Sequence, residues 1–205
     1  GTFGDGFNYS ITVFDTEWEE FQMTLYSVFG IAFVDNVPGA ESRGIEVEFA
    51  GYLTDSFMID FAFSHVDASV TEDFIYSRAT GRDISGGARL PGSAENEMFV
   101  SGTYTVNLSD YGSMAFNVNA SYKGDVLSNF AESGSNFEKF GSFTVWNARV
   151  TWDLGDYQLT LFGNNLSDEL GQSMVGTPDF FGDRDQHKGL IRPRTFGLGF
   201  NYKLY

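Results

Sequence analysis

The sequence of 205 residues contains no cysteine, only 4 prolines and no long apolar run, and these shortages exclude several classes of protein. Without cysteine there is no disulfide, no zinc-thiolate site and no thiol chemistry. No stretch reaches the roughly 18 consecutive apolar residues that mark a transmembrane helix. Basic residues are also scarce, because 12 Lys and Arg stand against 28 Asp and Glu, for a formal net charge of -16. Such a surface repels polyanions, so nucleic acid is not expected as a partner.

Aromatic residues and glycine, in contrast, are abundant. The chain holds 22 Phe, 10 Tyr and 24 Gly, which favour strands and turns over helices. The mean hydropathy of -0.18 resembles that of a water-soluble protein. The alternating strands of a membrane barrel give a similar average, however, because one of their faces is polar. Composition therefore predicts an all-β fold and leaves the surroundings of its apolar face open.

Apolar and polar residues alternate along most of the chain. In the last segment, Phe196, Leu198, Phe200 and Tyr202 are apolar, and the residues between them are small or polar. The same period of two, which is that of a strand, recurs in residues 7–13, 45–53, 57–64, 98–107, 114–123, 146–152 and 157–161. About eight strands follow, each near the length of about 9–11 residues that a tilted membrane-spanning strand requires.

The connections between these segments alternate in length. Tight turns rich in Asp, Gly and Ser join some neighbours, whereas residues 70–97, 124–141 and 167–192 form long polar loops. This is the layout of an antiparallel up-and-down transmembrane β-barrel, with short periplasmic turns, long extracellular loops and a periplasmic C-terminus. The first two strands are long enough to project into the external medium, where Asp15, Glu17, Glu19 and Glu20 would be solvated.

The polar face of the segments indicates where the apolar face lies. It carries mostly Ser, Thr, Asn, Gln and Gly with few charges, unlike the Lys- and Glu-rich surface of a soluble β-sandwich. Large aromatic residues stand at the strand ends of the apolar face, as at Tyr122, Trp152 and Tyr202, a position favoured at the lipid headgroups. Lipid outside is therefore the preferred interpretation. The alternative is a soluble domain with an aromatic core, which would refold without detergent.

Four stretches resemble the C-terminal part of TonB-dependent outer-membrane receptors. They are, in chain order, "FGDGFNYSITVFDTEWEEFQ" (residues 3–22), "ESRGIEVEF" (41–49), "LFGNNLSDE" (161–169) and "RPRTFGLGFNYKL" (192–204). Members of this family enclose a plug domain in a barrel of about 22 strands. The resemblance implies that residues 1–205 are the last third of such a barrel, with the plug domain and the early strands absent.

The resemblance also implies a function and its partners. This segment would form barrel wall and extracellular loops in a Gram-negative outer membrane, for TonB-dependent active uptake of a siderophore, corrinoid, saccharide or similar nutrient. Its partners would be outer-membrane lipid, the nutrient, the barrel-assembly machinery and, through the absent plug, the TonB energy-transducing complex. The alternative is a complete eight-stranded barrel with a structural or adhesion role, in which the strand at Phe7 pairs with the strand at Phe196.

Three groups of candidate site residues follow from these placements. The residues expected to face the lumen are Glu46, Glu48, Asp60, Lys123 and Arg149, since Lys or Arg facing lipid at mid-depth would cost about 2–4 kcal/mol. The aromatic and charged loop residues expected to contact the nutrient are Phe74, Tyr76, Arg78, Arg82, Phe180, Phe181, Asp183, Arg184 and His187. The assembly signal is expected at Gly199, Tyr202 and Leu204 of the last strand.

An enzymatic function is not expected. The chain has two histidines, His65 and His187, so a histidine metal cluster is not available. Glu46 and Glu48 lie on the same face of one strand. This placement is expected for residues that line a lumen as much as for a catalytic pair of carboxylates. Neither a catalytic residue, a metal site nor a cofactor is predicted.

Overall fold

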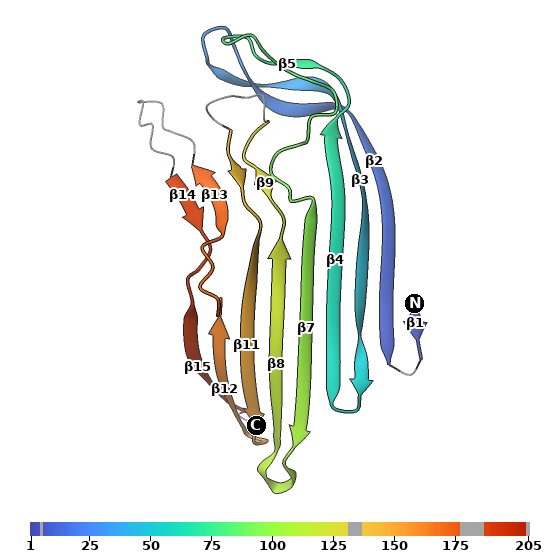
Figure 1. The fold of residues 1–205 in the computed structure, drawn as a ribbon, viewed down its shortest axis with the longest axis vertical. Coiled ribbons are helices and arrows are strands. Elements are labelled where there is room, and N and C mark those ends of the chain that lie inside the picture. Colours follow the sequence, from blue (N-terminus) through green and yellow to red (C-terminus); the bar gives the residue numbers. More distant parts are fainter. Residues whose placement is uncertain (5, 131–136, 177–186, 204–205) are drawn as a thin grey trace.

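Eight long antiparallel strands form the wall of the molecule in the computed structural model, which describes residues 1–4, 6–130, 137–176 and 187–203 (Figure 1). They are β2 (Phe7–Tyr26), β3 (Ala32–Thr54), β4 (Phe57–Val70), β7 (Asn96–Asn107), β8 (Ser113–Lys123), β11 (Phe143–Asp153), β12 (Tyr157–Asn164) and β15 (Thr195–Tyr202). The predicted all-β, up-and-down arrangement of about eight strands is confirmed. The described residues contain no helix long and apolar enough to cross a membrane.

The wall is an open sheet. Its order is β15-β12-β11-β8-β7-β4-β3-β2, so each long strand lies beside its neighbours in the chain. Beyond β2 the sheet continues into β5 (Phe74–Ser77) and β6 (Arg82–Ile84), while β1 (Thr2–Phe3) pairs with the start of β2. Because β2 and β15 lie at opposite ends of this order, the closed eight-stranded barrel is not the arrangement adopted by the described residues.

The connections fall into two sets at opposite ends of the wall (Figure 1). The short-turn end joins β3 to β4, β7 to β8 and β11 to β12, and the last two turns contact each other. Gly112 has φ of 78°, and a Cβ there would collide with the carbonyl oxygen of Asp153. Trp152 Nε1 donates a hydrogen bond of 2.8 Å to the Tyr111 carbonyl. The close approach of these turns therefore requires glycine at position 112.

The long-loop end carries two small hairpins in addition to β5 and β6. Strands β9 (Val126–Leu127) and β10 (Lys139–Phe140) pair with each other, and β13 (Gln172–Gly176) pairs with β14 (His187–Leu190). All of these short strands come from the three long loops predicted between 70–97, 124–141 and 167–192. The loops are thus partly ordered by their own backbone hydrogen bonds.

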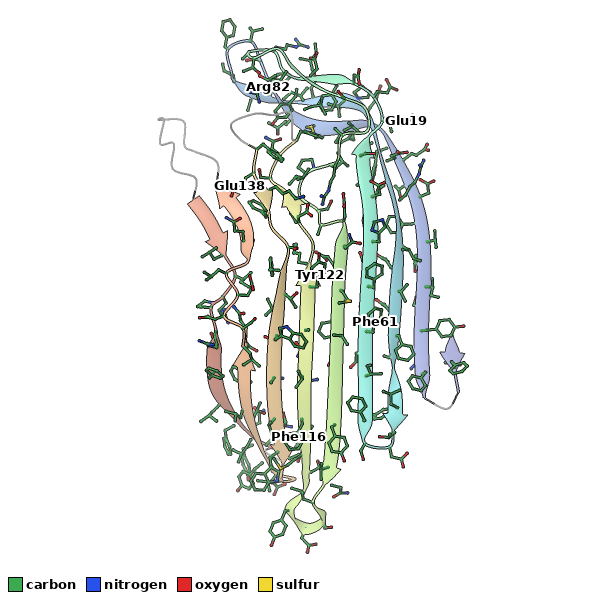
Figure 2. All side chains as sticks on the ribbon, in the orientation of Figure 1. Glu19, Phe61, Arg82, Phe116, Tyr122 and Glu138 are labelled. Atoms are coloured by element: carbon green, nitrogen blue, oxygen red, sulfur yellow. The ribbon has the colours of Figure 1, made fainter. Side chains whose placement is uncertain are left out.

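The register separates the sheet into an apolar face and a polar face. One apolar row pairs Phe49 with Phe61, Phe61 with Val100, and Ala120 with Trp146 on successive strands. Figure 2 shows Phe61, Phe116 and Tyr122 along β4 and β8. Phe116 is 41% exposed and Trp146 48% exposed, because no other part of the described chain covers this face. A soluble core of these aromatic side chains is therefore not formed.

The hairpin of β2 and β3 bends at the long-loop end. Its pairing is interrupted at Glu20, which the register places opposite Pro38, a residue that has no N–H to donate. Glu20 also adopts a positive φ of 52°. The predicted solvated acids, from Asp15 to Glu20, are exposed. Beyond Glu20 the hairpin turns over the top of the sheet, a bend that the alternation in the sequence did not indicate (Figure 1).

Candidate functional site

The polar face holds all five charged residues predicted to line a lumen. Glu46 lies in a row with Ser64, Glu97 and Lys123, and Glu48 lies in the next row opposite Ala62. Asp60 pairs with Ser101, and Arg149 pairs with Asn117. The sequence pattern thus brings these residues to one face, while their contact with a lumen stays a prediction.

Near the long-loop end this face forms an acidic hollow of about 510 Å³. Its charged lining consists of Glu46, Glu48, Glu97 and Lys123, with Phe99 among its apolar walls. Lys123 Nζ lies 3.6 Å from Glu97 Oε1, an exposed pair of modest strength. Glu46 and Glu48 have no basic partner among the described residues, so the hollow attracts cationic groups.

A chain of side-chain amides crosses the polar face below this hollow. Asn117 Nδ2 donates to Ser101 Oγ at 2.8 Å, and Asn119 Nδ2 donates to Asn117 Oδ1 at 3.0 Å. Asn147 Nδ2 then donates to Asn119 Oδ1 at 2.8 Å, and the Asn165 backbone N–H donates to Asn147 Oδ1 at 2.9 Å. The amides link β7, β8, β11 and the end of β12, so this strip is neutral, hydrogen-bonded and fixed in orientation.

The long loops share a hydrophobic core, which we call the loop core. Its buried members are Leu25, Val37, Val70, Phe74, Tyr76, Ile84 and Phe130. They come from the bent hairpin, from residues 70–90 and from the loop after β8. Ile84 is 0% exposed and Phe130 is 1% exposed. The bent hairpin and the loops of residues 70–97 and 124–141 are therefore packed together as one unit over the end of the wall.

The loop core contains two of the residues predicted to contact the nutrient. Phe74 and Tyr76 are 9% and 8% exposed, and both rings pack edge-on against Phe130. Burial gives these two rings a packing role, and their contact with the nutrient stays a prediction. Arg78 is exposed and Arg82 half-buried at the same end, so their role as nutrient contacts stays a prediction.

The other predicted nutrient contacts lie in the third long loop. Phe180, Phe181, Asp183 and Arg184 lie outside the described residues. His187 is the first residue of β14, where its backbone pairs with Gly176. Contact of this loop with a ligand therefore stays a prediction.

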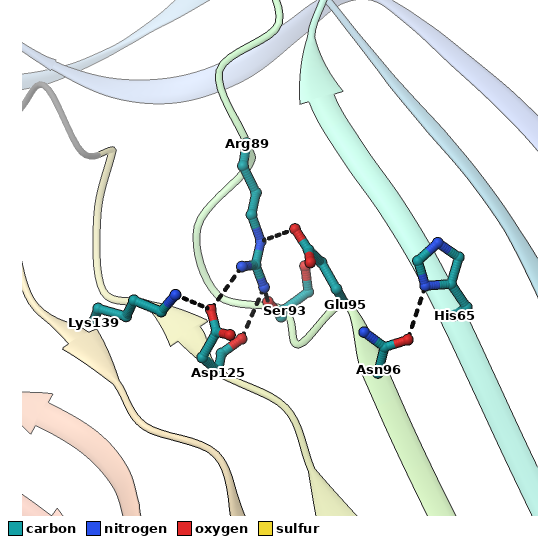
Figure 3. Close-up of polar contacts among 7 residues, drawn as sticks. All are labelled: His65, Arg89, Ser93, Glu95, Asn96, Asp125 and Lys139. Atoms are coloured by element: carbon teal, nitrogen blue, oxygen red, sulfur yellow. Dashed lines mark hydrogen bonds and ion pairs between the residues drawn. The ribbon is translucent and has the colours of Figure 1, made fainter.

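An ionic cluster beneath the loop core was not foreseen from the sequence (Figure 3). Arg89 Nη1 lies 2.9 Å from Asp125 Oδ2, and Arg89 Nε lies 3.3 Å from Glu95 Oε1. Lys139 Nζ lies 3.1 Å from the same Asp125 oxygen. Arg89 Nη2 also donates to the carbonyl oxygens of Ser93 and Asp125. The half-buried Arg89 thus joins the loop of residues 70–97 to the loop of residues 124–141, a long-range contact without a local sequence signal.

Acidic pH should loosen this junction. Burial by itself would raise the pKa of Asp125, but hydrogen bonds and charges from Lys139 and Arg89 hold this pKa below its ordinary value of 3.8. The stabilisation is therefore complete above pH 3.8 and is lost as the pH falls through the lowered pKa. We expect hydrogen exchange in residues 124–130, corrected for intrinsic rates, to accelerate in that range. The Asp125→Asn variant should lack this pH dependence, and an identical profile in both proteins would contradict the assignment.

The end of β12 is tied to the start of β15 by a polar turn. Asn165 is 3% exposed, with Nδ2 donating to the carbonyls of Glu169 at 2.9 Å and Arg192 at 3.1 Å. Its Oδ1 accepts the Glu169 N–H at 2.8 Å. Asp168 Oδ1 accepts the Arg194 N–H at 3.0 Å. The "NNLSDE" stretch therefore fixes where the last strand begins.

The predicted assembly signal lies in the strand that follows. Gly199 pairs with Thr160 on the polar face, and Tyr202 lies on the apolar face, stacked on Tyr157 with ring centroids 5.0 Å apart. Leu204 lies outside the described residues. The role of these residues in assembly stays a prediction.

No group of histidine and acidic side chains suited to holding a metal ion occurs in the described ranges. The site is instead a wall whose polar face carries a neutral strip of amides and an acidic hollow, with an uncovered apolar face and loops packed at one end. These features define the class of protein as a segment of a membrane-type up-and-down β-barrel.

The chain belongs to the TonB-dependent receptor-like β-barrel family, whose model matches residues 2–166. Comparison with curated proteins gives no match. Among solved structures, the ferric yersiniabactin uptake receptor FyuA from Yersinia pestis is similar over 98% of this chain and 28% of its own, with a TM-score of 0.74 and 13% identity.

Two further solved structures show the same fold. The siderophore receptor PiuA from Acinetobacter baumannii is similar over 96% of this chain and 26% of its own, with a TM-score of 0.71 and 17% identity. The copper transporter OprC is similar over 97% of this chain and 29% of its own, with a TM-score of 0.70 and 17% identity. The chain thus spans little more than a quarter of the length of these proteins.

Proposed function

We propose that this chain is the C-terminal part of the barrel wall of an outer-membrane receptor that takes up a nutrient by TonB-dependent active transport. The observation that carries the proposal is the two-faced wall, with one uncovered apolar face and one polar face, in a chain of this family. The plug domain and the early strands lie outside these 205 residues. The long-loop end faces the exterior, and the short turns and the C-terminus face the periplasm.

The polar face lines the lumen around the plug in this proposal. Glu46 and Glu48 contact basic side chains of the plug, since neither carboxylate has a basic partner among the described residues. Asp60, Lys123 and Arg149 complete the charged lining. TonB acts through the plug, and the wall stays fixed because its strands are joined by continuous backbone ladders.

The nutrient binds at the long-loop end. Arg78, Arg82 and the third long loop, with Phe180, Phe181, Asp183, Arg184 and His187, are the proposed contacts. Siderophores, corrinoids and saccharides are the candidate classes. Metal chelates are the first to test, because FyuA is described as a ferric yersiniabactin uptake receptor, PiuA as a siderophore receptor and OprC as a copper transporter. No cofactor and no chemistry on the nutrient are proposed.

Uptake by cells tests this function directly. A strain lacking the receptor should lose accumulation of one labelled metal chelate, corrinoid or saccharide, and the complete receptor gene should restore it. Inactivating TonB should abolish the same uptake, because transport would then lack its energy source. A receptor deletion that leaves accumulation of the whole panel unchanged, or uptake that persists without TonB, would overturn the proposal.

A further inference from the structure

The apolar face contains a hollow of about 430 Å³ near its centre. Its floor consists of Gly102 on β7 and Ala120 on β8, and its rim includes Tyr104, Phe116 and Trp146. All five belong to the face that no part of the described chain covers. The hollow is therefore a recess in the surface that, by the proposed function, meets lipid.

The register explains how the recess forms. Tyr104 pairs with Phe116 in one row, and Ala120 pairs with Trp146 two rows away. Between them, Gly102 pairs with Val118. Large rings on both sides of a row that contains glycine leave a depression, because Gly102 has no side chain to fill it.

The lining residues form a groove with an exposed rim and a buried floor. Tyr104 is 49% exposed and Trp146 48% exposed, so the rim stands out from the sheet. Ala120, although it lies on the uncovered face, is only 6% exposed. A Cβ on Gly102 would lie 3.2 Å from the Phe57 ring, so the floor is already closed on that side. The recess is thus apolar on its floor and its walls.

The depth of the recess selects its occupant. Val118 is the central residue of β8 (Ser113–Lys123), five residues from either end. At about 3.3 Å per residue, the recess lies roughly 16 Å along the strand from both ends, beyond the reach of polar headgroups. We propose that it binds one acyl chain of an outer-membrane lipid, which exchanges more slowly than lipid on the rest of the apolar face. This inference rests on the membrane location in the proposed function.

An acyl chain fits the recess better than a second copy of the wall. A flexible chain of methylenes follows the floor between the rings and gains dispersion contacts on three sides. Another sheet face would rest on the projecting rings of Tyr104 and Trp146 and leave a void beneath them. The atoms that line such a void would lose the dispersion contacts that stabilise a packed interface.

Photolabelling of the complete receptor in phospholipid vesicles tests the site. A phospholipid with a diazirine at mid-chain is illuminated, and labelled peptides are mapped by mass spectrometry. Label should concentrate on Trp146, Tyr104 and Val118 relative to Ile11, which is 62% exposed on the same face of β2. The expected enrichment is about threefold, because bound chains spend longer in contact with the rim.

Two variants fill the recess from different sides. Val118→Phe adds a ring between the rims, and Ala120→Leu raises the floor, and each should reduce the label on Trp146 to the level at Ile11. Ile11→Phe is the matched control and should leave the label on Trp146 unchanged. A folded barrel migrates differently on a gel before and after heating, and this shift shows whether each variant is folded. If one filling variant does not fold, the other one alone tests the site.

The outcomes separate the acyl-chain site from the proposed function. Even labelling across the apolar face, or undiminished label on Trp146 in a folded filling variant, overturns the site and leaves the membrane location intact. Label absent from every apolar-face residue overturns the membrane location on which both proposals rest. Label on Trp146 that falls as the protein-to-lipid ratio in the vesicles is raised, as expected if a second copy covers the recess, overturns the site in favour of self-association.

Discussion

Replacing Phe130 with alanine is expected to weaken the packing of the loops against one another at the long-loop end. The ring is 1% exposed and packs against Phe74 and Tyr76, so its loss leaves a cavity in the loop core. Removing a buried Phe costs about 3–5 kcal/mol when the surroundings cannot collapse. If the amides of the loops exchange through local opening, this loss should accelerate their exchange by roughly two to four orders of magnitude.

Hydrogen exchange of the complete receptor measures this effect at individual amides. The Val70, Gly87 and Leu90 N–H groups are suitable, because they join the end of β4 to the loop that follows it. They donate to the carbonyls of Ala88, Val70 and Ala68, respectively, at 2.7–3.0 Å. Phe130→Leu, which keeps most of the volume, should cost less than about 1.5 kcal/mol. Amides in the middle of β8 should be unaffected, since they bond to β7 and β11. Unchanged exchange at Val70, Gly87 and Leu90 in Phe130→Ala would show that this ring does not hold the loops together.

The strands of the wall were predictable from sequence because their signal is local. Ile59, Phe61 and Phe63 are apolar at every second position, because a strand with one apolar face and one polar face has this period. The register then follows from short turns, so Glu46, Glu48 and Asp60 could be assigned to one face before any contact was known. Closure was not predictable, because it depends on whether β2 meets β15.

The loop core was not predictable for the opposite reason. Leu25, Ile84 and Phe130 are far apart in the chain and share no period, so nothing local marks them as partners. Phe74 and Tyr76 were interpreted as ligand contacts because aromatic residues in a polar loop are typical of binding sites. Their burial shows that the same residues can be required to hold a loop together.

The amide chain on the polar face lies between these cases. The alternation places Asn117, Asn119 and Asn147 on one face, but hydrogen bonds depend on the lateral alignment of three strands. Asn147 pairs directly with Asn119, which brings their amides to 2.8 Å. A shift of one residue would send each amide into the apolar face, where an unpaired amide is costly. The amide chain therefore supports the register that makes one face polar.

Asn165→Ala should be the most damaging exchange of a polar side chain in the wall. The variant loses hydrogen bonds to the Glu169 N–H, the Glu169 carbonyl and the Arg192 carbonyl, all at a buried position. Three bonds of about 1 kcal/mol each, with their partners left unpaired, predict a loss of about 3–5 kcal/mol. The change should lower the urea midpoint for unfolding of the complete receptor in lipid vesicles, followed by tryptophan fluorescence.

Two further variants separate the causes of this loss. Asn165 has φ of 51°, which glycine adopts without the strain that alanine suffers. Asn165→Gly should therefore be about 1–2 kcal/mol less damaging than Asn165→Ala, although it loses the same side-chain hydrogen bonds. Asn164→Ala is the matched control, since the side-chain amide of Asn164 makes no hydrogen bond among the described residues. Equal midpoints for Asn164→Ala and Asn165→Ala would mean that the turn does not anchor β15, and the start of the last strand would then be held by its ladder with β12 alone.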